Sequence, residues 1–368
     1  MSTRKDKFSL KDIKYMGIAL DLAKARHGLT GENPSVGCVI VKDDEIISIG
    51  QTGFNGRPHA EINAIKNSNI SLAGSKMYVT LEPCNHQGKT PPCTNKILKS
   101  KIKKVFYSID DIDKKVKGKS LKILQSKNII VKKGLLKKDM INFYTPYFFN
   151  RKYNIPYVTG KIAVSKNNLI YSKGTKRITD IHSDKFSHIL RYNNDSIMIS
   201  YKTLNKDNPK LNCRIENFNK FSPKRIILDR NLETNINSYI FKTAKNNNTI
   251  IFYKNADNFK ILFFKRKGIK LIKSDLIDDK YFDFKLILKK LYKLGCRNLL
   301  VEGGNDLSKN ILKSKLFNQF YLFKSSKILS KLVTHKDFNS FKCLSQNYKS
   351  KIKINTKLGN DSIMLYKK

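Results

Sequence analysis

Two short segments of the sequence combine side chains that can bind a metal ion and move a proton. His59-Ala60-Glu61 comes first, and the pairs Pro83-Cys84 and Pro92-Cys93 follow it. Zn²⁺ favours imidazole and thiolate ligands, and a catalytic zinc site keeps three protein ligands and leaves its fourth position to water. His59, Cys84 and Cys93 would fill three positions, and the bound water would lose its proton near neutral pH. Glu61 could then carry that proton without binding the metal.

The spacing of the two cysteines bears on which kind of zinc site this is. Zinc deaminases carry a His-x-Glu sequence and a later Pro-Cys-x-x-Cys run, whereas here the eight residues NHQGKTPP separate Cys84 from Cys93. His86 lies in this insert and could close the site as a fourth ligand, which would make the zinc structural. The glutamate beside the histidine favours a hydrolytic deaminase that uses zinc hydroxide. A non-catalytic, zinc-stabilised scaffold is the alternative.

The length and composition of the chain predict two domains. It has 368 residues, 40% of them hydrophobic, and single hydrophobic cores stop growing at roughly 250–300 residues. We see no apolar run of the roughly 18 residues that a membrane span needs. The opening MSTRKDKFSLKD lacks the apolar stretch of a secretory signal, and the six cysteines are too sparse for a disulfide framework. We therefore expect a cytoplasmic protein without a membrane partner.

The net charge is strongly positive, at +44 from 73 Lys and Arg against 29 Asp and Glu. The excess is nearly all lysine, it is spread from end to end, and aromatic residues are not concentrated beside it as on a base-stacking platform. We therefore expect a solvated surface that can steer anionic substrates, and no nucleic-acid partner. An RNA-directed zinc deaminase with a C-terminal binding domain is the alternative that this charge leaves open.

Periodicity in the first half predicts helices on a sheet. Ser9 and Asp12 form a capping-box pattern before a helix that ends near Arg26, and VGCVIVKDDEIISIG predicts two strands that turn at Asp43-Asp44. Further helices are expected over 59–66, from near Pro83, and in KSLKILQSK, and further strands over 77–81, 105–107 and 129–131. The alternation indicates a helix-flanked sheet.

A second α/β domain is expected after a junction around PYFFNRKYNIPY, where Pro146 and Pro156 bracket a stretch without a clear period. We place the domains at 1–150 and 151–368. The strands predicted in the second are 157–164, 196–199, 225–228, 249–253, 298–301 and 319–323, and the helices 180–191, 286–294 and 306–315.

The motifs of the first half resemble a known family. N-P-S-V-G-C-V-I-V (33–41), H-A-E (59–61) and T-L-E-P-C-N-H-Q-G-K-T-P-P-C (80–93) resemble, in order, the deaminase motifs of the bifunctional diaminohydroxyphosphoribosylaminopyrimidine deaminase and 5-amino-6-(5-phosphoribosylamino)uracil reductase of riboflavin biosynthesis. The long cysteine spacing is part of that pattern. The resemblance implies a cytidine-deaminase-like three-layer α/β/α domain that binds zinc through His59, Cys84 and Cys93. It also implies that Glu61 carries the proton, and that Asn33, His86 and Lys89 lie near the pyrimidine or its ribose phosphate.

The second half resembles the reductase of the same family. K-I-A-V-S (161–165), T-K-R-I-T (175–179), D-N-P-K-L-N-C-R (207–214) and V-E-G-G-N-D-L (301–307) keep its order, which implies a dihydrofolate-reductase-like α/β domain. Adjacent glycines that enter a helix let backbone amides approach a phosphate. By resemblance, the NADPH contacts are Ala163, Arg177, Thr203, Asp207, Arg230, Gly304, Asn305, Asp306, Leu307, Ser308, Lys309 and Asn310. The contacts to the phosphoribosyl substrate are Thr175, Arg191, Leu211, Arg214 and Glu302, and the planar forks of the two arginines suit a phosphate.

Two departures from the family pattern concern the reductase. After Ser165 the family usually has Asp-Gly and a basic residue, but this chain reads Lys166-Asn167-Asn168-Leu169, and Arg177 stands where an aromatic residue is common. Asn167-Asn168 can still form the turn, and Arg177 could meet a cofactor phosphate. A deaminase with a degenerate reductase is therefore a further alternative.

The expected function is a pair of reactions. Zinc hydroxide would deaminate 2,5-diamino-6-(5-phosphoribosylamino)pyrimidin-4-one to the uracil, and NADPH would then reduce the ribosyl group to ribityl. The partner is a small phosphorylated pyrimidine, and a homo-oligomer is compatible with the sequence.

Overall fold

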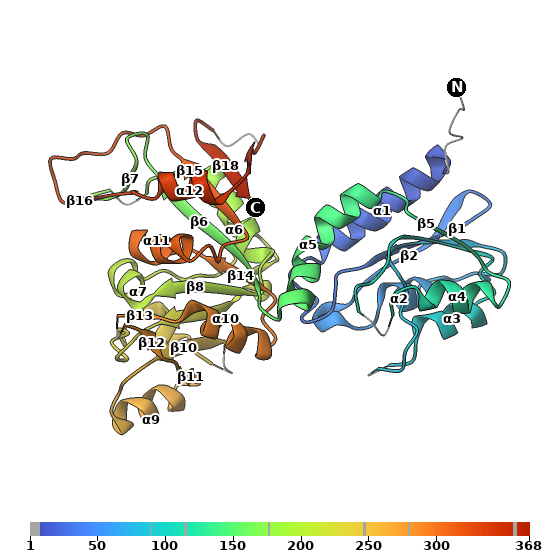
Figure 1. The fold of residues 1–368 in the computed structure, drawn as a ribbon, viewed down its shortest axis with the longest axis horizontal. Helices are drawn as coiled ribbons and strands as arrows, with labels where there is room; N and C mark the ends of the chain where they lie inside the picture. The colour runs from blue at the N-terminus through green and yellow to red at the C-terminus, as the bar shows by residue number, and fades with distance from the viewer. Residues whose placement is uncertain are drawn as a thin grey trace. The chain divides into compact units, whose positions relative to one another are not determined.

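The computed structural model of the chain describes residues 8–88, 90–113, 116–175, 177–245, 248–278, 280–355 and 359–368. The chain folds as two compact units, Met1–Asn154 and Ile155–Lys368 (Figure 1). None of the described helices combines the length and the apolar composition that a membrane span needs.

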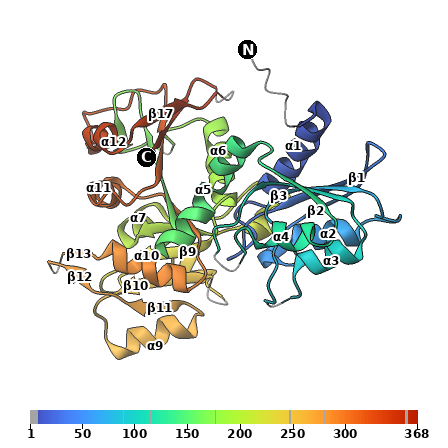
Figure 2. The same cartoon turned by 45° about the vertical axis from the view of Figure 1, so that its right-hand side comes forward.

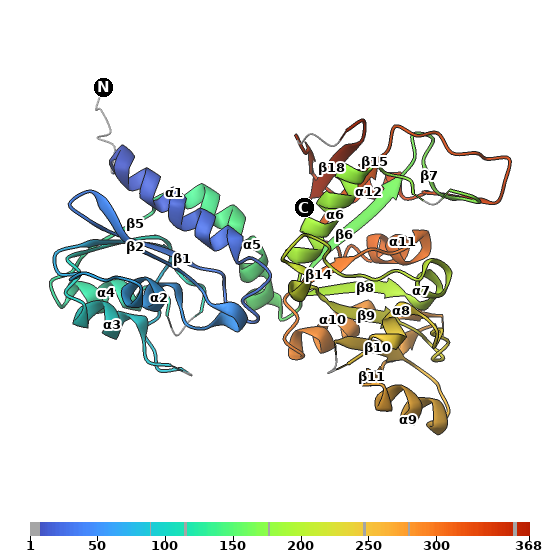
Figure 3. The same cartoon turned by 180° about the vertical axis from the view of Figure 1, so that it is seen from behind.

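The described strands of the first unit form one five-stranded sheet in the order β2-β1-β3-β4-β5. The elements are α1 (Leu10–Ala25), β1 (Gly37–Lys42), β2 (Glu45–Gln51), the 3-10 turn η1 (Phe54–Gly56), α2 (Ala60–Lys66), β3 (Lys76–Leu81), α3 (Cys93–Lys99), β4 (Lys104–Ile109), α4 (Lys119–Gln125), β5 (Ile130–Lys133) and α5 (Lys137–Tyr153). Strand β1 pairs antiparallel with β2 and β3, whereas β3, β4 and β5 are parallel. Helices α1 and α5 cover one face, and α2, α3 and α4 cover the other (Figures 1 and 3). The predicted three-layer arrangement is confirmed.

Local sequence explains the elements that carry the site. The capping box of Ser9 and Asp12 is formed, and Asp43 and Asp44 both have positive φ, as the tight turn between β1 and β2 requires. Gly50 of β2 has no side chain because the backbone of α2 lies against it: a Cβ there would collide with the carbonyl oxygen of Ala60 and the amide of Ala64. This close approach fixes where α2 begins.

Two expectations for the first unit are wrong. No helix starts at Pro83; among the described residues between β3 and α3 no helix or strand forms, and the Cys84 carbonyl oxygen accepts a hydrogen bond from the backbone amide of Thr94. The stretch after Pro146, expected to lack a period, is helical as far as Tyr153. Tyr144, Tyr147 and Phe148 lie on one side of α5 and pack against the core of the first unit, which outweighs the hydrogen bond lost at the proline.

The second unit contains a nine-stranded sheet in the order β11-β10-β9-β8-β14-β6-β15-β18-β17. Its strands are β6 (Tyr157–Val164), β7 (Leu169–Ser172), β8 (Ser196–Ser200), β9 (Lys224–Leu228), β10 (Thr249–Tyr253), β11 (Lys270–Lys273), β12 (Leu276–Ile277), β13 (Tyr281–Phe282), β14 (Asn298–Val301), β15 (Gln319–Lys324), β16 (His335–Asp337), β17 (Ser350–Lys353) and β18 (Ser362–Lys367). Its helical elements are α6 (Ile181–Tyr192), α7 (Tyr201–Asp207), the 3-10 turn η2 (Asn219–Phe221), α8 (Tyr239–Lys242), α9 (Asn258–Arg266), α10 (Phe284–Lys293), α11 (Asn305–Lys313) and α12 (Phe341–Asn347).

The strands of the large sheet are parallel from β11 to β15. At its end, β18 pairs antiparallel with β15, and β17 pairs antiparallel with β18. One hydrophobic core lies between the sheet and helices α10, α11 and α12, and a second lies on the other face, under α6, α8 and α9. Figure 2 shows α12 beside α11, and α9 beside β11 at one edge. The α/β architecture and all six predicted strands of this half are confirmed. The strand pair β16 and β7 was not predicted.

Candidate active site

The three predicted zinc ligands come from three separate elements of the first unit and meet at one point. His59 is the N-cap residue of α2, Cys84 lies in the loop after β3, and Cys93 is the first residue of α3. Their ligand atoms all lie within 4.8 Å of one another, and within the described ranges no other three His, Cys, Asp or Glu residues form such a group. His59 Nδ1 is 3.3 Å from Cys93 Sγ and 3.6 Å from Cys84 Sγ.

These spacings fit one tetrahedral zinc ion, whose nitrogen and sulfur ligands stand roughly 3.5–3.8 Å apart when they lie at the usual distances from the metal. The state of Cys84 also fits. The hydrogen bond with Cys93, with a further contribution from His59, lowers the pKa of the Cys84 thiol to about 4. The same hydrogen bond and burial raise the pKa of the Cys93 thiol, so without a metal ion one proton is shared by the two sulfurs. A thiolate is the form that binds zinc. His86 is not a member of the group, so the described residues supply three ligands and leave room for water.

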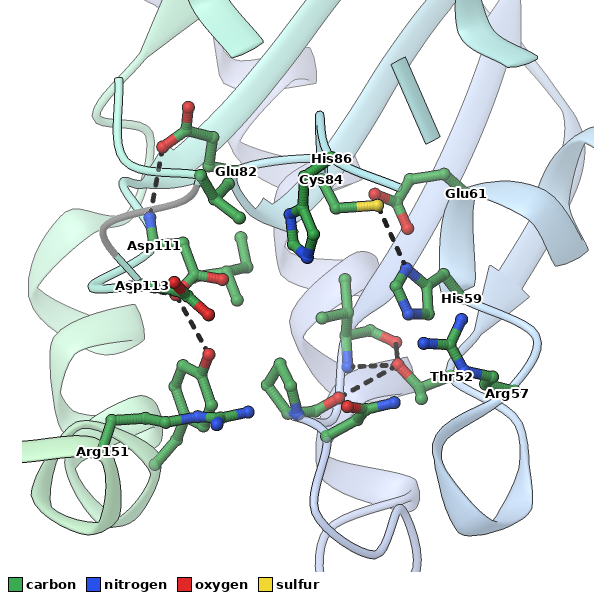
Figure 4. A pocket seen from close by; sticks show the side chains of 16 residues that line it. Thr52, Arg57, His59, Glu61, Glu82, Cys84, His86, Asp111, Asp113 and Arg151 are labelled. Atoms are coloured by element: carbon green, nitrogen blue, oxygen red, sulfur yellow. Dashed lines mark hydrogen bonds between the residues drawn. The ribbon is translucent and has the colours of Figure 1, made fainter. Parts of the chain in front are cut away.

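Glu61 stands beside this group in the first turn of α2, where its side chain faces Cys84 and His59 (Figure 4). Burial raises the pKa of Glu61 to about 7, although the charge of His59 acts in the opposite direction. A carboxyl group with a pKa near neutrality can both accept and release a proton at working pH. The position and the acidity of Glu61 therefore suit the role of proton carrier.

A pocket opens in front of His59, Glu61 and Cys84, within the first unit. It is lined by Asn33, Pro34, Val36, Thr52, Arg57, His59, Glu61, Leu81, Glu82, Cys84, His86, Asp111, Asp113, Val116, Tyr147 and Arg151 (Figure 4). The Asn33 amide donates to the Gly56 carbonyl oxygen over 2.9 Å. His86 Nδ1 is buried and has no hydrogen-bond partner among the described residues, so it can take a ligand atom. Lys89, the third predicted substrate contact, lies outside the described residues.

Sequence reasoning missed the residues of the wall opposite the zinc ligands. Glu82 is buried, and its carboxylate accepts hydrogen bonds from the backbone amides of Asp111, Gly118 and Ser120. It therefore anchors the loop that carries Asp111 into the pocket. Glu82 directly precedes Pro83-Cys84, and this position next to a predicted zinc ligand could have pointed to it. Asp111 lies in a segment without a recognisable catalytic motif, so the sequence offered no sign of its place in the pocket.

In the second unit, the predicted substrate contacts Arg191 and Glu302 form a buried pair. Arg191 Nε and Nη2 donate to the two carboxylate oxygens of Glu302, each over 2.8 Å. Burial alone would raise the pKa of Glu302, but the charge and hydrogen bonds of Arg191 hold it at about 2. Arg214 lies close by, since both arginines contact Asn212: Arg191 at its carbonyl oxygen and Arg214 at its side-chain oxygen. Leu211, by contrast, has its side chain in the hydrophobic core.

Most of the predicted NADPH contacts follow the carboxyl ends of parallel strands, which meet at one edge of the sheet. Gly304 is the N-cap of α11 after β14, Thr203 lies in α7 after β8, and Arg230 is exposed after β9. A Cβ on Gly304 would stand 3.7 Å from Thr203 Oγ1, so these two positions adjoin. Ligands of open α/β sheets bind at this edge.

The other residues predicted to contact NADPH differ in how accessible their side chains are. Asn305, Asp306, Lys309 and Asn310 are partly or fully accessible in α11, whereas Leu307 and Ser308 are buried, and Ser308 donates to the Gly303 carbonyl oxygen. Ala163 lies in β6, and Asp207 ends α7.

The segment that departs from the family pattern still forms a turn. Asn168 has a φ of 65°, its amide donates to Ser165, and the Asn167 side chain holds the backbone of Leu329. Thr175, the remaining predicted substrate contact, lies in the loop that follows β7, and its amide donates to the Ser172 carbonyl oxygen. Asn167-Asn168 therefore forms the turn expected at this position.

A three-ligand zinc group beside a buried carboxyl, followed by a parallel α/β unit with a glycine-led helix, defines a two-domain enzyme that joins a zinc hydrolase to a nucleotide-dependent reductase. Comparison with known proteins agrees with this class. Residues 9–109 match the cytidine and deoxycytidylate deaminase zinc-binding region, and residues 156–354 match the RibD C-terminal domain.

The chain is 33% identical to the riboflavin biosynthesis protein RibD of Aquifex aeolicus (strain VF5), over 97% of this chain and 98% of the relative. It is 32% identical to that of Actinobacillus pleuropneumoniae, over 97% and 96%. Among solved structures, Acinetobacter baumannii RibD, form 2, matches with a TM-score of 0.83 at 25% identity, covering 97% of this chain and 98% of that one. The Thermotoga maritima diaminohydroxyphosphoribosylaminopyrimidine deaminase/5-amino-6-(5-phosphoribosylamino)uracil reductase matches with a TM-score of 0.79 at 27% identity, covering 97% and 98%. The chain belongs to the RibD family of riboflavin biosynthesis proteins.

Proposed function

We propose that the chain catalyses two consecutive reactions of riboflavin biosynthesis. The first is the hydrolytic deamination of 2,5-diamino-6-(5-phosphoribosylamino)pyrimidin-4-one to the corresponding uracil. The second is the NADPH-dependent reduction of the ribosyl group to ribityl. The observation that carries the proposal is the convergence of His59, Cys84 and Cys93 near the buried carboxyl of Glu61, at a pocket that His59, Glu61 and Cys84 line.

In the deaminase, His59, Cys84 and Cys93 would hold zinc, which when bound supplies a Lewis acid that makes water a nucleophile at neutral pH. Glu61 would take one proton from the attacking water and pass it to a ring nitrogen, and would then move the remaining proton of the newly added hydroxyl group to the amino group, which leaves as ammonia. Its pKa of about 7 suits both directions of transfer. Asn33 and His86 line the same pocket and orient the pyrimidine or its ribose phosphate.

In the reductase, the cofactor supplies the hydride and the protein supplies orientation. The glycine-led N-terminus of α11 offers backbone amides to the NADPH phosphates, beside Thr203. Arg191, Arg214 and Glu302 lie together on the substrate side. We assign the deaminase to 1–150 and the reductase to 151–368.

We further propose that the protein acts in the cytoplasm, on a small substrate and not on RNA. The family to which the chain belongs supports the choice of a small substrate over the RNA-directed alternative. Salt separates the two, since polynucleotide binding weakens steeply with ionic strength, whereas turnover of the small substrate should change only modestly. Light scattering on the purified chain would test whether it forms a homo-oligomer.

The variant Glu61→Gln tests the deaminase assignment. We expect ammonia release to fall by at least about 100-fold, because a positioned proton carrier contributes roughly 10²- to 10⁴-fold. Zinc content should not change, and NADPH oxidation on supplied 5-amino-6-(5-phosphoribosylamino)uracil should continue. Unchanged ammonia release would favour the zinc-stabilised scaffold. Full ammonia release by the wild type without any NADPH oxidation on the uracil would favour the degenerate reductase.

A further inference from the structure

Three nitrogen donors in the second unit surround one carboxylate oxygen at more than hydrogen-bond distance. Arg177 Nη2 is 3.7 Å, Arg214 Nη2 3.6 Å and His188 Nε2 3.8 Å from Asp184 Oδ2. Good N–H···O hydrogen bonds span about 2.7–3.2 Å. The three donors therefore lie close to the carboxylate of Asp184, but none of them forms a good hydrogen bond with its Oδ2 atom.

His188 gives an independent indication that this place receives a ligand. The side chain is buried, and Nδ1 accepts a hydrogen bond from the backbone amide of Arg214 over 3.2 Å. A neutral imidazole that accepts at Nδ1 carries its proton on Nε2. Burial lowers the pKa of His188, which keeps the ring neutral. Nε2 thus presents a buried N–H toward Asp184, and it has no hydrogen-bond partner among the described residues.

The position of Arg177 in the fold connects it to the substrate contacts. Asp184 and His188 stand on α6, as does Arg191, and Arg214 is linked to Arg191 through Asn212.

We propose that Arg177 binds the phosphate monoester of the reductase substrate together with Arg214 and His188, and does not bind NADPH. This inference rests on the proposed reductase activity and revises the assignment of Arg177 that the resemblance implied.

The chemistry of a phosphate monoester suits this donor set. Such a group carries close to two negative charges and three acceptor oxygens at neutral pH, and each guanidinium offers five N–H donors in a planar fork. The side chains of Arg177 and Arg214 are 54% and 43% exposed, so their remaining donors can be reached from solvent. Asp184 acts as a positioning residue that holds both arginines in place before the substrate arrives.

The test is steady-state kinetics of the full-length chain with supplied 5-amino-6-(5-phosphoribosylamino)uracil. We expect Arg177→Ala to raise the KM for the uracil roughly tenfold, the lower end of what one charged hydrogen bond supplies. The KM for NADPH and the preference for NADPH over NADH should not change. Arg177→Lys should recover part of the loss, and Arg266→Ala, at an exposed arginine at the end of α9, should behave as the wild type. A higher KM for NADPH, or a lost preference over NADH, with an unchanged KM for the uracil would overturn the inference, and so would no change in any of them.

A second measurement does not depend on turnover. Inorganic phosphate is titrated into the NADPH-saturated chain by calorimetry, and Arg177→Ala should weaken its binding roughly tenfold while NADPH still binds. Equal phosphate binding by both proteins would refute the role of Arg177. A wild type that binds phosphate but never oxidises NADPH with the uracil would instead refute the proposed reductase.

Discussion

The buried pair of Arg191 and Glu302 should stabilise the second unit far more than an exposed pair of the same length. Both contacts of the pair measure 2.8 Å, and the side chains are only 11% and 12% exposed. Glu302→Gln keeps the size of the side chain but removes its charge, so Arg191 is left buried without the carboxylate that it contacts. Breaking a buried pair in this way costs about 3–5 kcal/mol.

The matched control is the pair of Lys254 and Asp275 in the same unit. Its N···O distance is also 2.8 Å, but Asp275 is 74% exposed. Asp275→Asn should therefore destabilise the unit far less than Glu302→Gln. Urea unfolding and scanning calorimetry would measure the stability of both variants. A two-domain chain need not unfold in one step, so the two variants are compared at the transition that Glu302→Gln shifts. Equal losses in the two variants would refute the argument from burial.

The same pair gives a pH dependence with a defined sign. The pKa of Glu302 is held at about 2 in the folded chain, below the ordinary value of about 4.3 for glutamate. A carboxyl with a lowered pKa stabilises the fold above its ordinary pKa, and this contribution is lost as the pH falls toward 2. The difference in unfolding free energy between the wild type and Glu302→Gln should therefore be constant from pH 7 to about 5 and shrink below. A difference that grows on acidification would contradict the sign.

Three further predictions concern the first unit. Gly50→Ala should displace α2 and with it the first zinc ligand, because the added methyl group meets the backbone of α2; zinc content and ammonia release should both fall, and NADPH oxidation on supplied uracil should not. Glu82→Gln removes the charge that three backbone amides share, so hydrogen exchange at Gly118 and Ser120 should quicken at least about tenfold, since a charged hydrogen bond supplies roughly 1.5–3 kcal/mol; unchanged protection would show that the loop does not depend on it. Removal of the metal by a chelator should stop ammonia release reversibly and leave the reductase active, whereas loss of both activities would indicate that zinc supports the whole fold.

The zinc group could be predicted from the sequence because the chemistry restricts the residue types. A histidine two residues before a glutamate, and two cysteines that each follow a proline, leave few alternatives. Their meeting in space depends on where α2 and α3 begin, and the sequence signals only the first of these starts. The start of α3 at Cys93 follows from a hydrogen bond between Thr94 and Cys84, which local propensity does not reveal.

Residues that act through long-range contacts could not be found in advance. Arg151 reaches the pocket from the last turns of α5, a segment where Pro146 argued against a helix. The resemblance to the family assigned Arg177 to the cofactor. Its ion pair with Asp184 places it beside Arg214, 37 positions further along the chain. Both placements depend on tertiary packing that no single segment encodes.

The most direct test of the central claim is a single assay of the purified, zinc-loaded chain with 2,5-diamino-6-(5-phosphoribosylamino)pyrimidin-4-one. Ammonia release is followed with and without NADPH, and NADPH oxidation is recorded alongside. We predict that ammonia appears in both cases and that NADPH is oxidised only after deamination has begun, up to one equivalent per ammonia released. A folded, zinc-loaded chain that releases no ammonia would contradict the proposed function.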